Sequence, residues 1–111
     1  MNFLDMKPLS LNSAYRGRRF ETPELKAYKQ EIALRLPKAL PLPKGKKMRA
    51  WYRFGVSSKN CDGDNLIKCF QDALADCYGF NDKMIYAWDV EKVDVPKGQE
   101  YIAFELQDLQ K

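Results

Sequence analysis

The residues best suited to chemistry are the run Asp62-Gly63-Asp64-Asn65-Leu66-Ile67-Lys68 and the later Asp82. Carboxylates crowded together repel one another unless a cation neutralises them, and hard oxygen ligands suit Mg²⁺. A metal ion held by the aspartates would polarise a phosphoryl group and lower the pKa of a bound water. The Lys68 ammonium would offset the developing negative charge. This pattern indicates hydrolysis of a phosphodiester.

The charge distribution points to the kind of substrate. Residues 1–59 contain fourteen lysines and arginines and four acids, whereas residues 60–111 contain five and eleven. A basic half suits a polyanionic partner and an acidic half can hold a cation. Ordinary solvated surface charge is the alternative reading of this asymmetry.

Several other kinds of site are excluded by composition and spacing. The chain has no histidine, which rules out histidine-based triads and histidine-bound zinc. An EF-hand counted from Asp62 fails, because Ile67 and Ala73 stand where it needs glycine and glutamate. No P-loop motif is present. Three cysteines without a C-x-x-C pair disfavour disulfides and structural zinc, and we expect Cys69 and Cys77 beside the buried face of a helix.

A helix over residues 64–78, ended by Gly79, positions the acidic motif. Its helical period predicts one buried side, formed by Leu66, Phe70, Ala73, Leu74 and Cys77. Asp64, Lys68 and Asp72 share the opposite side. Without a metal these three would form an ordinary salt-bridge ladder, worth about 0.3–0.5 kcal/mol per pair.

The remaining elements predict an α+β fold in a single domain, residues 1–111, with a small mixed β-sheet, two main helices and the order β-α-β-α-β-β. Thr22 and Pro23 begin a helix that runs to about Leu36, with Leu25, Tyr28 and Ile32 on its buried stripe. Strands are expected at 3–8, 48–57, 84–93 and 100–106 from their alternating or apolar patterns, and 37–47 reads as a linker.

The motif Asp62-x-Asp64-Asn65-x-x-Lys68-x-x-x-Asp72-Ala73-Leu74, followed by Asn81-Asp82, resembles the RusA-type Holliday-junction resolvases. The Pro8-x-Ser10-x-Asn12 element with Arg16 is similar to the N-terminal motif of that family, and Lys92 falls where a basic residue is usual. Asn81 stands where many members have a further aspartate.

This resemblance implies a homodimeric, Mg²⁺-dependent endonuclease that cuts four-way DNA junctions, with Mn²⁺ as a possible substitute ion. Asp62, Asp64 and Asp82 match the metal-binding aspartates, and Lys68 matches the catalytic lysine. A two-fold dimer would present two equivalent sites to two equivalent strands. Candidate phosphate contacts are Arg16, Arg18, Arg19, Lys44, Lys46, Lys47 and Arg49.

Two other functions stay open at this point. One is a DNA-binding or regulatory module that keeps the fold without activity, and the other is a structural protein whose acidic helix is only a solvated face. No apolar run approaches the ~20 residues that span a bilayer, and residues 1–6 lack a signal-peptide pattern. We therefore expect a protein of the cytoplasm, bacterial or of a phage-infected host.

Overall fold

The computed structural model describes residues 2–9, 15–16, 20–38, 40, 42, 46–58 and 63–109. The α+β prediction is confirmed: two helices lie against a four-stranded mixed sheet. The helices are α1 (Pro23–Arg35) and α2 (Gly63–Tyr78), with a short 3-10 helix η1 (Asp82–Met84). The strands are β1 (Asn2–Leu4), β2 (Tyr15–Arg16), β3 (Phe20–Glu21), β4 (Met48–Val56), β5 (Ile85–Asp94) and β6 (Tyr101–Asp108).

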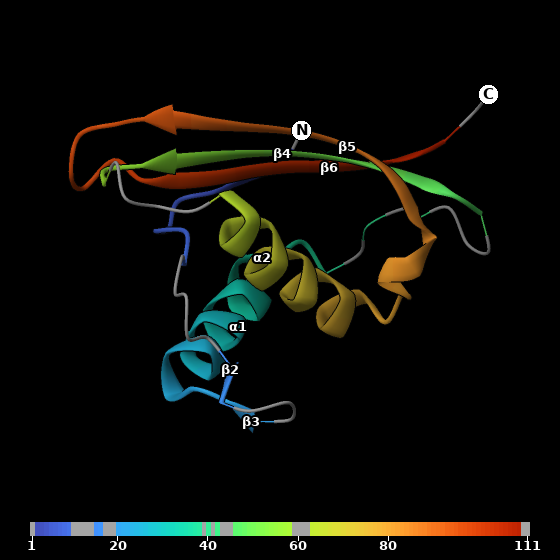
Figure 1. Cartoon of the computed structure of the whole chain (residues 1–111), viewed down its shortest axis with the longest axis horizontal. Coiled ribbons are helices and arrows are strands. Elements are labelled where there is room, and N and C mark those ends of the chain that lie inside the picture. The colour runs from blue at the N-terminus through green and yellow to red at the C-terminus, as the bar shows by residue number, and fades with distance from the viewer. Residues whose placement is uncertain are drawn as a thin grey trace.

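The strand order in the main sheet is β1-β6-β4-β5. β4 runs parallel to β5 and antiparallel to β6, and β6 is antiparallel to β1. Both helices lie on one side of the sheet, with α2 against it and α1 beyond α2 (Figure 1). The separate β2–β3 hairpin was not expected from the sequence and lies close to the start of α1.

The first helix begins and ends where its sequence predicts. The Thr22 hydroxyl accepts a hydrogen bond from the Leu25 backbone N–H at 3.3 Å, and Pro23 occupies the first turn, where no N–H is needed. Leu36 caps the other end, just before Pro37. Leu25, Tyr28 and Ile32 are buried as predicted, so this stripe faces the core.

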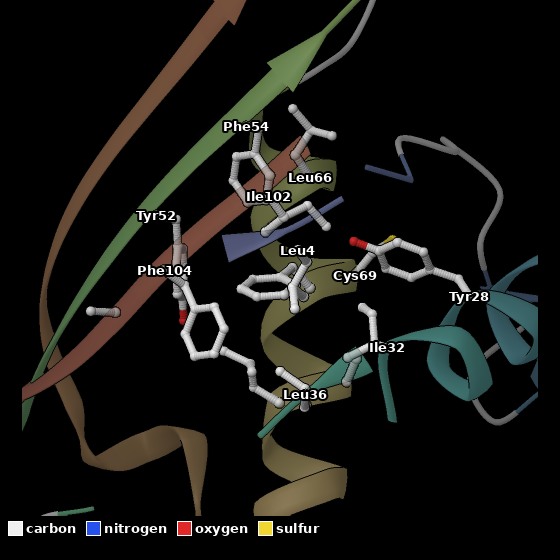
Figure 2. Packing of buried hydrophobic residues seen from close by; sticks show 14 of the residues in the cluster. Leu4, Tyr28, Ile32, Leu36, Tyr52, Phe54, Leu66, Cys69, Ile102 and Phe104 are labelled. Carbon is white, nitrogen blue, oxygen red and sulfur yellow. The ribbon is translucent and has the colours of Figure 1, made fainter. Parts of the chain in front are cut away.

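The core lies between α2 and the sheet. Phe70 of α2 meets the rings of Tyr52, Phe54 and Phe104 edge-on, with centroids 5.3, 5.9 and 5.4 Å away. Figure 2 shows the strand residues Tyr52, Phe54 and Phe104 on the side that faces Leu66 and Cys69 of α2. The predicted alternation of β4 is therefore confirmed, since its even-numbered residues fill this core.

Three side chains lie differently from the sequence expectation. Cys77 is exposed rather than buried, whereas Cys69 is buried. A register shift at Met48/Arg49 pairs Met48 with Ile85 and Arg49 with Ala87, so that Tyr86 is the extra residue of a bulge. Alternation over 84–93 predicts one face with Met84, Tyr86, Trp88 and Val90 and the other with Ile85, Ala87, Asp89 and Glu91. At the start of the strand, however, Ile85 is buried and Tyr86 is exposed.

The sheet face away from the helices carries its own small aromatic cluster. A Cβ at Gly55 would lie 2.3 Å from the Tyr101 ring, so the glycine makes room for that ring. Phe3 then stacks on Tyr101 with ring centroids 5.1 Å apart. Further along the same face, the Arg53 guanidinium lies 4.9 Å above the Trp51 ring and 2.8 Å from Glu91.

Candidate active site

The start of α2 carries the two best-defined residues of the acidic motif. Asp64 is exposed in the first helical turn, and Lys68 is exposed one turn later. Residues four apart on a helix lie on the same side, so the carboxylate and the ammonium face one region of solvent. A carboxylate in a first turn is also stabilised by the unpaired backbone N–H groups, typically by about 0.3–1 kcal/mol. Asp62 lies outside the residues that the structure describes.

Asp82 is the first residue of η1, which follows the C-terminal end of α2 and contacts that helix. The turn is fixed by Asn81, whose side-chain oxygen accepts from the Lys83 backbone N–H at 3.0 Å. The Asn81 carbonyl accepts from the Met84 N–H, also at 3.0 Å. Asn81 thus stabilises the local turn at the position where many family members have a further aspartate. Asp82 is exposed beside it.

The negative charge of Asp82 contributes to raised pKa values of two nearby groups, Asp72 and Tyr52. Asp72 is half-buried, and burial together with the nearby Asp82 and Asp76 carboxylates raises its pKa to about 6. The pKa of Tyr52 is also raised, first by burial and then by Asp82. Asp82 therefore belongs with Asp72 and Tyr52, next to the later turns of α2.

The helix separates this region from Asp64. Asp64 and Asp72 are eight residues apart, which is about 12 Å along a helix that rises about 1.5 Å per residue. Within the described part of the chain, no three acidic or cysteine side chains are gathered closely enough to hold a metal ion. The predicted meeting of Asp82 with Asp64 and Asp62 in one chain therefore stays a prediction.

Gln71 is a site residue that the sequence did not indicate. Its side-chain oxygen accepts two hydrogen bonds at 2.9 Å each, from the Tyr52 hydroxyl and from the Trp88 indole N–H. One amide thereby joins α2 to both β4 and β5 immediately before Asp72. Nothing in the local spacing of Gln71 distinguishes it from other polar helix residues, because its two partners come from distant strands.

The candidate DNA contacts are only partly placed. Arg18, Arg19 and Lys44 fall outside the described residues, and Arg16 belongs to β2. Lys46, Lys47 and Arg49 are exposed around the start of β4.

Both of these exposed lysines already have neighbours in the chain. The Lys46 ammonium is 3.8 Å from an Asp108 carboxylate oxygen, and the Lys47 ammonium lies 4.6 Å above the Tyr86 ring. Such surface contacts are weak, so both lysines can still exchange them for phosphate.

Arg49 lies on the open face of the sheet, on the same side of β4 as Trp51 and Arg53. The exposure of Arg49 fits a contact with DNA, and the Arg53 guanidinium over the Trp51 ring fits arginine–aromatic packing on the sheet surface. Among the described residues, no helix combines the length and apolar character that crossing a membrane requires.

The comparison with protein families gives this arrangement a context. Residues 9–102 match the family described as endodeoxyribonuclease RusA, which is most of the 111-residue chain and includes every residue of the acidic motif. No curated protein matches the chain. On this match, and with an α+β fold that exposes Asp64, Lys68 and Asp82, the chain belongs to the RusA endodeoxyribonuclease family.

Proposed function

We propose that this protein is a Mg²⁺-dependent, structure-selective endonuclease that resolves four-way and other branched DNA junctions in recombination and repair, acting as a homodimer in the cytoplasm. The family match over residues 9–102 carries the proposal. The matched segment keeps Asp62, Asp64, Lys68 and Asp82 together, and a module that only binds DNA has little use for these four groups.

The donor set suits the proposed ion. Asp62, Asp64 and Asp82 supply only carboxylate oxygens, the ligands that Mg²⁺ prefers, and Mn²⁺ accepts the same donors. The bound ion would polarise the phosphoryl group and lower the pKa of a coordinated water. Lys68 would place its ammonium beside the same phosphate and stabilise the negative charge of the transition state.

The geometry of α2 supports a site shared between two copies. A single rigid helix keeps Asp64 and the Asp72–Asp82 region about 12 Å apart along its axis, so Asp82 is poorly placed to share an ion with Asp64 of its own chain. A second copy can instead supply Asp82. In a two-fold dimer this exchange happens twice and forms two equivalent sites.

Asp64→Asn tests the catalytic assignment. The amide keeps the shape of the side chain but removes the charge that the metal requires, so we expect cleavage of a synthetic four-way junction in Mg²⁺ to fall at least ~100-fold. Junction binding, measured by mobility shift in a chelator, should stay within about two-fold. Glu24→Gln, an exposed change in the first turn of α1 and outside the motif, is the matched control. Undiminished cleavage by the Asp64 variant would show that the site is wrongly assigned.

Mixing two inactive variants tests whether the site is shared. If Asp82 acts in the second copy, a heterodimer of Asp64→Asn and Asp82→Asn retains one complete site and recovers cleavage of one strand. If Asp82 acts in its own chain, both sites of that heterodimer are defective and the mixture stays inactive. Nicking of a labelled junction by the mixed and separate variants distinguishes these outcomes.

A junction-binding module without activity remains the alternative function. Its signature is an unsubstituted protein that binds four-way junctions but does not cut them in Mg²⁺ or in Mn²⁺.

A further inference from the structure

We propose that the exposed rings of Tyr86 and Trp88 stack on an unpaired base of the DNA substrate, next to Asp82. The preferred substrates are then branched DNAs that carry single-stranded nucleotides at the branch point. This preference rests on the proposed function, whereas the stacking of a base on the two rings can be tested without cleavage.

Tyr86 and Trp88 form the one pair of exposed large hydrophobic residues that share a strand in the described part of the chain. They are 56% and 47% exposed and lie two positions apart on β5, the outer strand of the sheet. The other exposed large hydrophobic residues there, Phe3 and Leu34, belong to β1 and α1. Exposed apolar surface gathered in one place is typical of a binding site.

The Trp88 ring is held in place although almost half of the residue is open to solvent. Its indole N–H donates to the Gln71 side-chain oxygen at 2.9 Å, and the Tyr52 hydroxyl donates to the same oxygen at 2.9 Å. Because an indole N–H can only donate, the amide oxygen must face Trp88. A ring that is already oriented loses little conformational freedom when a ligand binds. Gln71 is therefore the positioning residue of the stacking surface.

Tyr86 owes its exposure to the bulge at the start of β5. Met48 pairs with Ile85 and Arg49 pairs with Ala87, which leaves Tyr86 as the extra residue. Ile85 is buried at this end of the strand, and Tyr86 is turned to solvent. Bulges re-aim side chains in this way and are frequent next to active sites.

Both rings lie close to the Asp72–Asp82 region. Asp82 begins η1, and β5 follows η1 directly, so that only a few residues separate Asp82 from Tyr86 (Figure 1). Trp88 is connected to the same region through Gln71 and Tyr52, since the charge of Asp82 contributes to the raised pKa of Tyr52. A nucleotide that stacks on these rings therefore lies beside the candidate site.

The charges around the two rings suit a polyanion. The Lys47 ammonium lies 4.6 Å above the Tyr86 ring. Lys46 and Lys83 are exposed at the same end of the sheet, because β4 and β5 start there and run parallel. Asp108, 3.8 Å from Lys46, and Asp82 oppose these three cations. Aromatic rings that stack bases, with cations beside them for the phosphates, are the usual means of binding single-stranded nucleic acid.

The open face of the sheet offers the competing aromatic surface, but its rings are already covered. Phe3 and Tyr101 stack on each other with centroids 5.1 Å apart, and the Arg53 guanidinium lies over Trp51. The register of the strands places three acids beside Trp51 and Arg53 on this face, namely Asp89, Glu91 and Glu105. The charge of the open face therefore favours a polyanion less than the charge around Tyr86 does.

Quenching of Trp88 fluorescence by a short oligonucleotide tests the stacking directly. Trp51→Phe removes the other tryptophan of the chain, so that the emission reports on Trp88 alone. In chelator, we expect a single-stranded thymidine oligonucleotide to quench this emission in a saturable manner. An abasic oligonucleotide of the same length and charge should leave it nearly unchanged. Equal quenching by both, or no quenching by thymidine at millimolar concentration, would overturn the proposal.

The affinity of Trp88 variants gives a second measurement. Trp88→Ala should weaken binding of the thymidine oligonucleotide about five- to one-hundred-fold in fluorescence anisotropy. Trp88→Phe should recover most of this loss, because it keeps an aromatic ring. With the abasic oligonucleotide the loss should disappear; a loss of equal size on both would mean that Trp88 acts only through the fold. Phe3→Ala, which removes an exposed ring from the open face, is the control and should change the affinity less than about two-fold.

Cleavage assays then test the substrate preference. We expect a four-way junction with unpaired thymidines at the branch point to have a lower KM than a fully paired junction, and Trp88→Ala should remove the difference. Equal KM values with the unsubstituted protein would refute the preference. Base-dependent quenching without any junction cleavage would refute only the nuclease, and cleavage without base-dependent quenching would refute only the stacking surface.

Discussion

At the residue scale, the site contains two acidic regions with different surroundings. Asp64 is exposed at the start of α2, where the helix favours its charge. Asp72 is half-buried and lies near two other carboxylates, and its raised pKa reflects both influences. Asp72 matches the family motif, and its protonation, unlike that of an exposed acid, changes near neutral pH.

The raised pKa of Asp72 predicts a pH-dependent stability. Its folded-state pKa is about 6, and an unfolded aspartate has a pKa of about 3.9, so the folded state binds more protons in between. The unfolding free energy should therefore fall as pH rises from about 4 to 6. Asp72→Asn should remove this fall and gain about 1 kcal/mol at pH 7, a small value because the carboxyl is partly exposed.

Urea unfolding in chelator at pH 4, 5, 6 and 7 measures this effect. The exposed Asp94→Asn serves as the control and should keep the wild-type pH dependence. A parallel pH profile for Asp72→Asn and the wild type would contradict the assignment of this titration to Asp72.

At the element scale, the position of α2 on the sheet depends on a few contacts. Phe70 packs on three rings, and Gln71 accepts hydrogen bonds from Tyr52 and Trp88. The phenylalanine supplies apolar burial, whereas the glutamine fixes the rotation of the helix relative to β4 and β5. Both residues lie within two positions of Asp72 in the sequence. The contacts that fix the position of α2 on the sheet therefore also fix the positions of its acidic side chains.

Gln71→Leu should destabilise the protein by about 1–3 kcal/mol, because two donors lose their acceptor and Tyr52 is fully buried. Urea unfolding measures the change, and Gln30→Leu on the exposed side of α1 is the control. In the Tyr52→Phe background the cost should shrink, since one of the donors is already gone. An undiminished cost would mean that Gln71 acts through packing alone.

Gly55→Ala should also destabilise, by about 1–3 kcal/mol, because the added methyl group would overlap the Tyr101 ring. Gly63→Ala provides the matched control: it has no atom within 4 Å of the added methyl group and lies in a helix, where alanine is favoured over glycine. Equal melting temperatures for the two variants would contradict the close contact at Gly55.

At the scale of the whole molecule, charge is divided between the two halves of the sequence. The basic half includes the Arg16–Arg19 segment and the lysines before β4, whereas the acidic half contains the site. A protein that binds junctions through phosphates releases counterions, so its affinity falls steeply with salt.

Replacing Arg18 and Arg19 with glutamine should weaken junction binding and reduce the slope of log affinity against log salt by about 1–2. Fluorescence anisotropy at several salt concentrations measures both quantities. Lys26→Gln combined with Lys97→Gln removes the same charge at exposed positions outside the proposed contacts, and should leave the slope nearly unchanged. An unchanged slope in the arginine variant would exclude this segment from the DNA surface.

Local sequence patterns predicted most of the fold. The stripe of Leu25, Tyr28 and Ile32 and the alternation of β4 depend on neighbours within a few residues, and both were confirmed. The features that were missed depend on distant partners. The Gln71 bridge needs two strands, and the bulge at Tyr86 needs the register with β4.

The candidate site shows the same division. Helical spacing predicted that Asp64 and Lys68 share one side, but it carried no information about where the chain would take Asp82. Exposure of Cys77 was missed because helical spacing places it in the middle of the apolar stripe, and spacing alone does not show that the last turn of α2 is left uncovered there.

The place of β6 in the sheet has a consequence for biosynthesis. β6 lies between β1 and β4, so the sheet cannot close until residues 101–108 have left the ribosome. Until then β1 (Asn2–Leu4) has no strand to pair with. The edge of β4 that later pairs with β6 presents unpaired backbone groups to other nascent chains. A stalled nascent chain that keeps residues 101–108 inside the ribosome should remain protease-sensitive and dependent on chaperones. Emergence of these eight residues should then complete folding in one step.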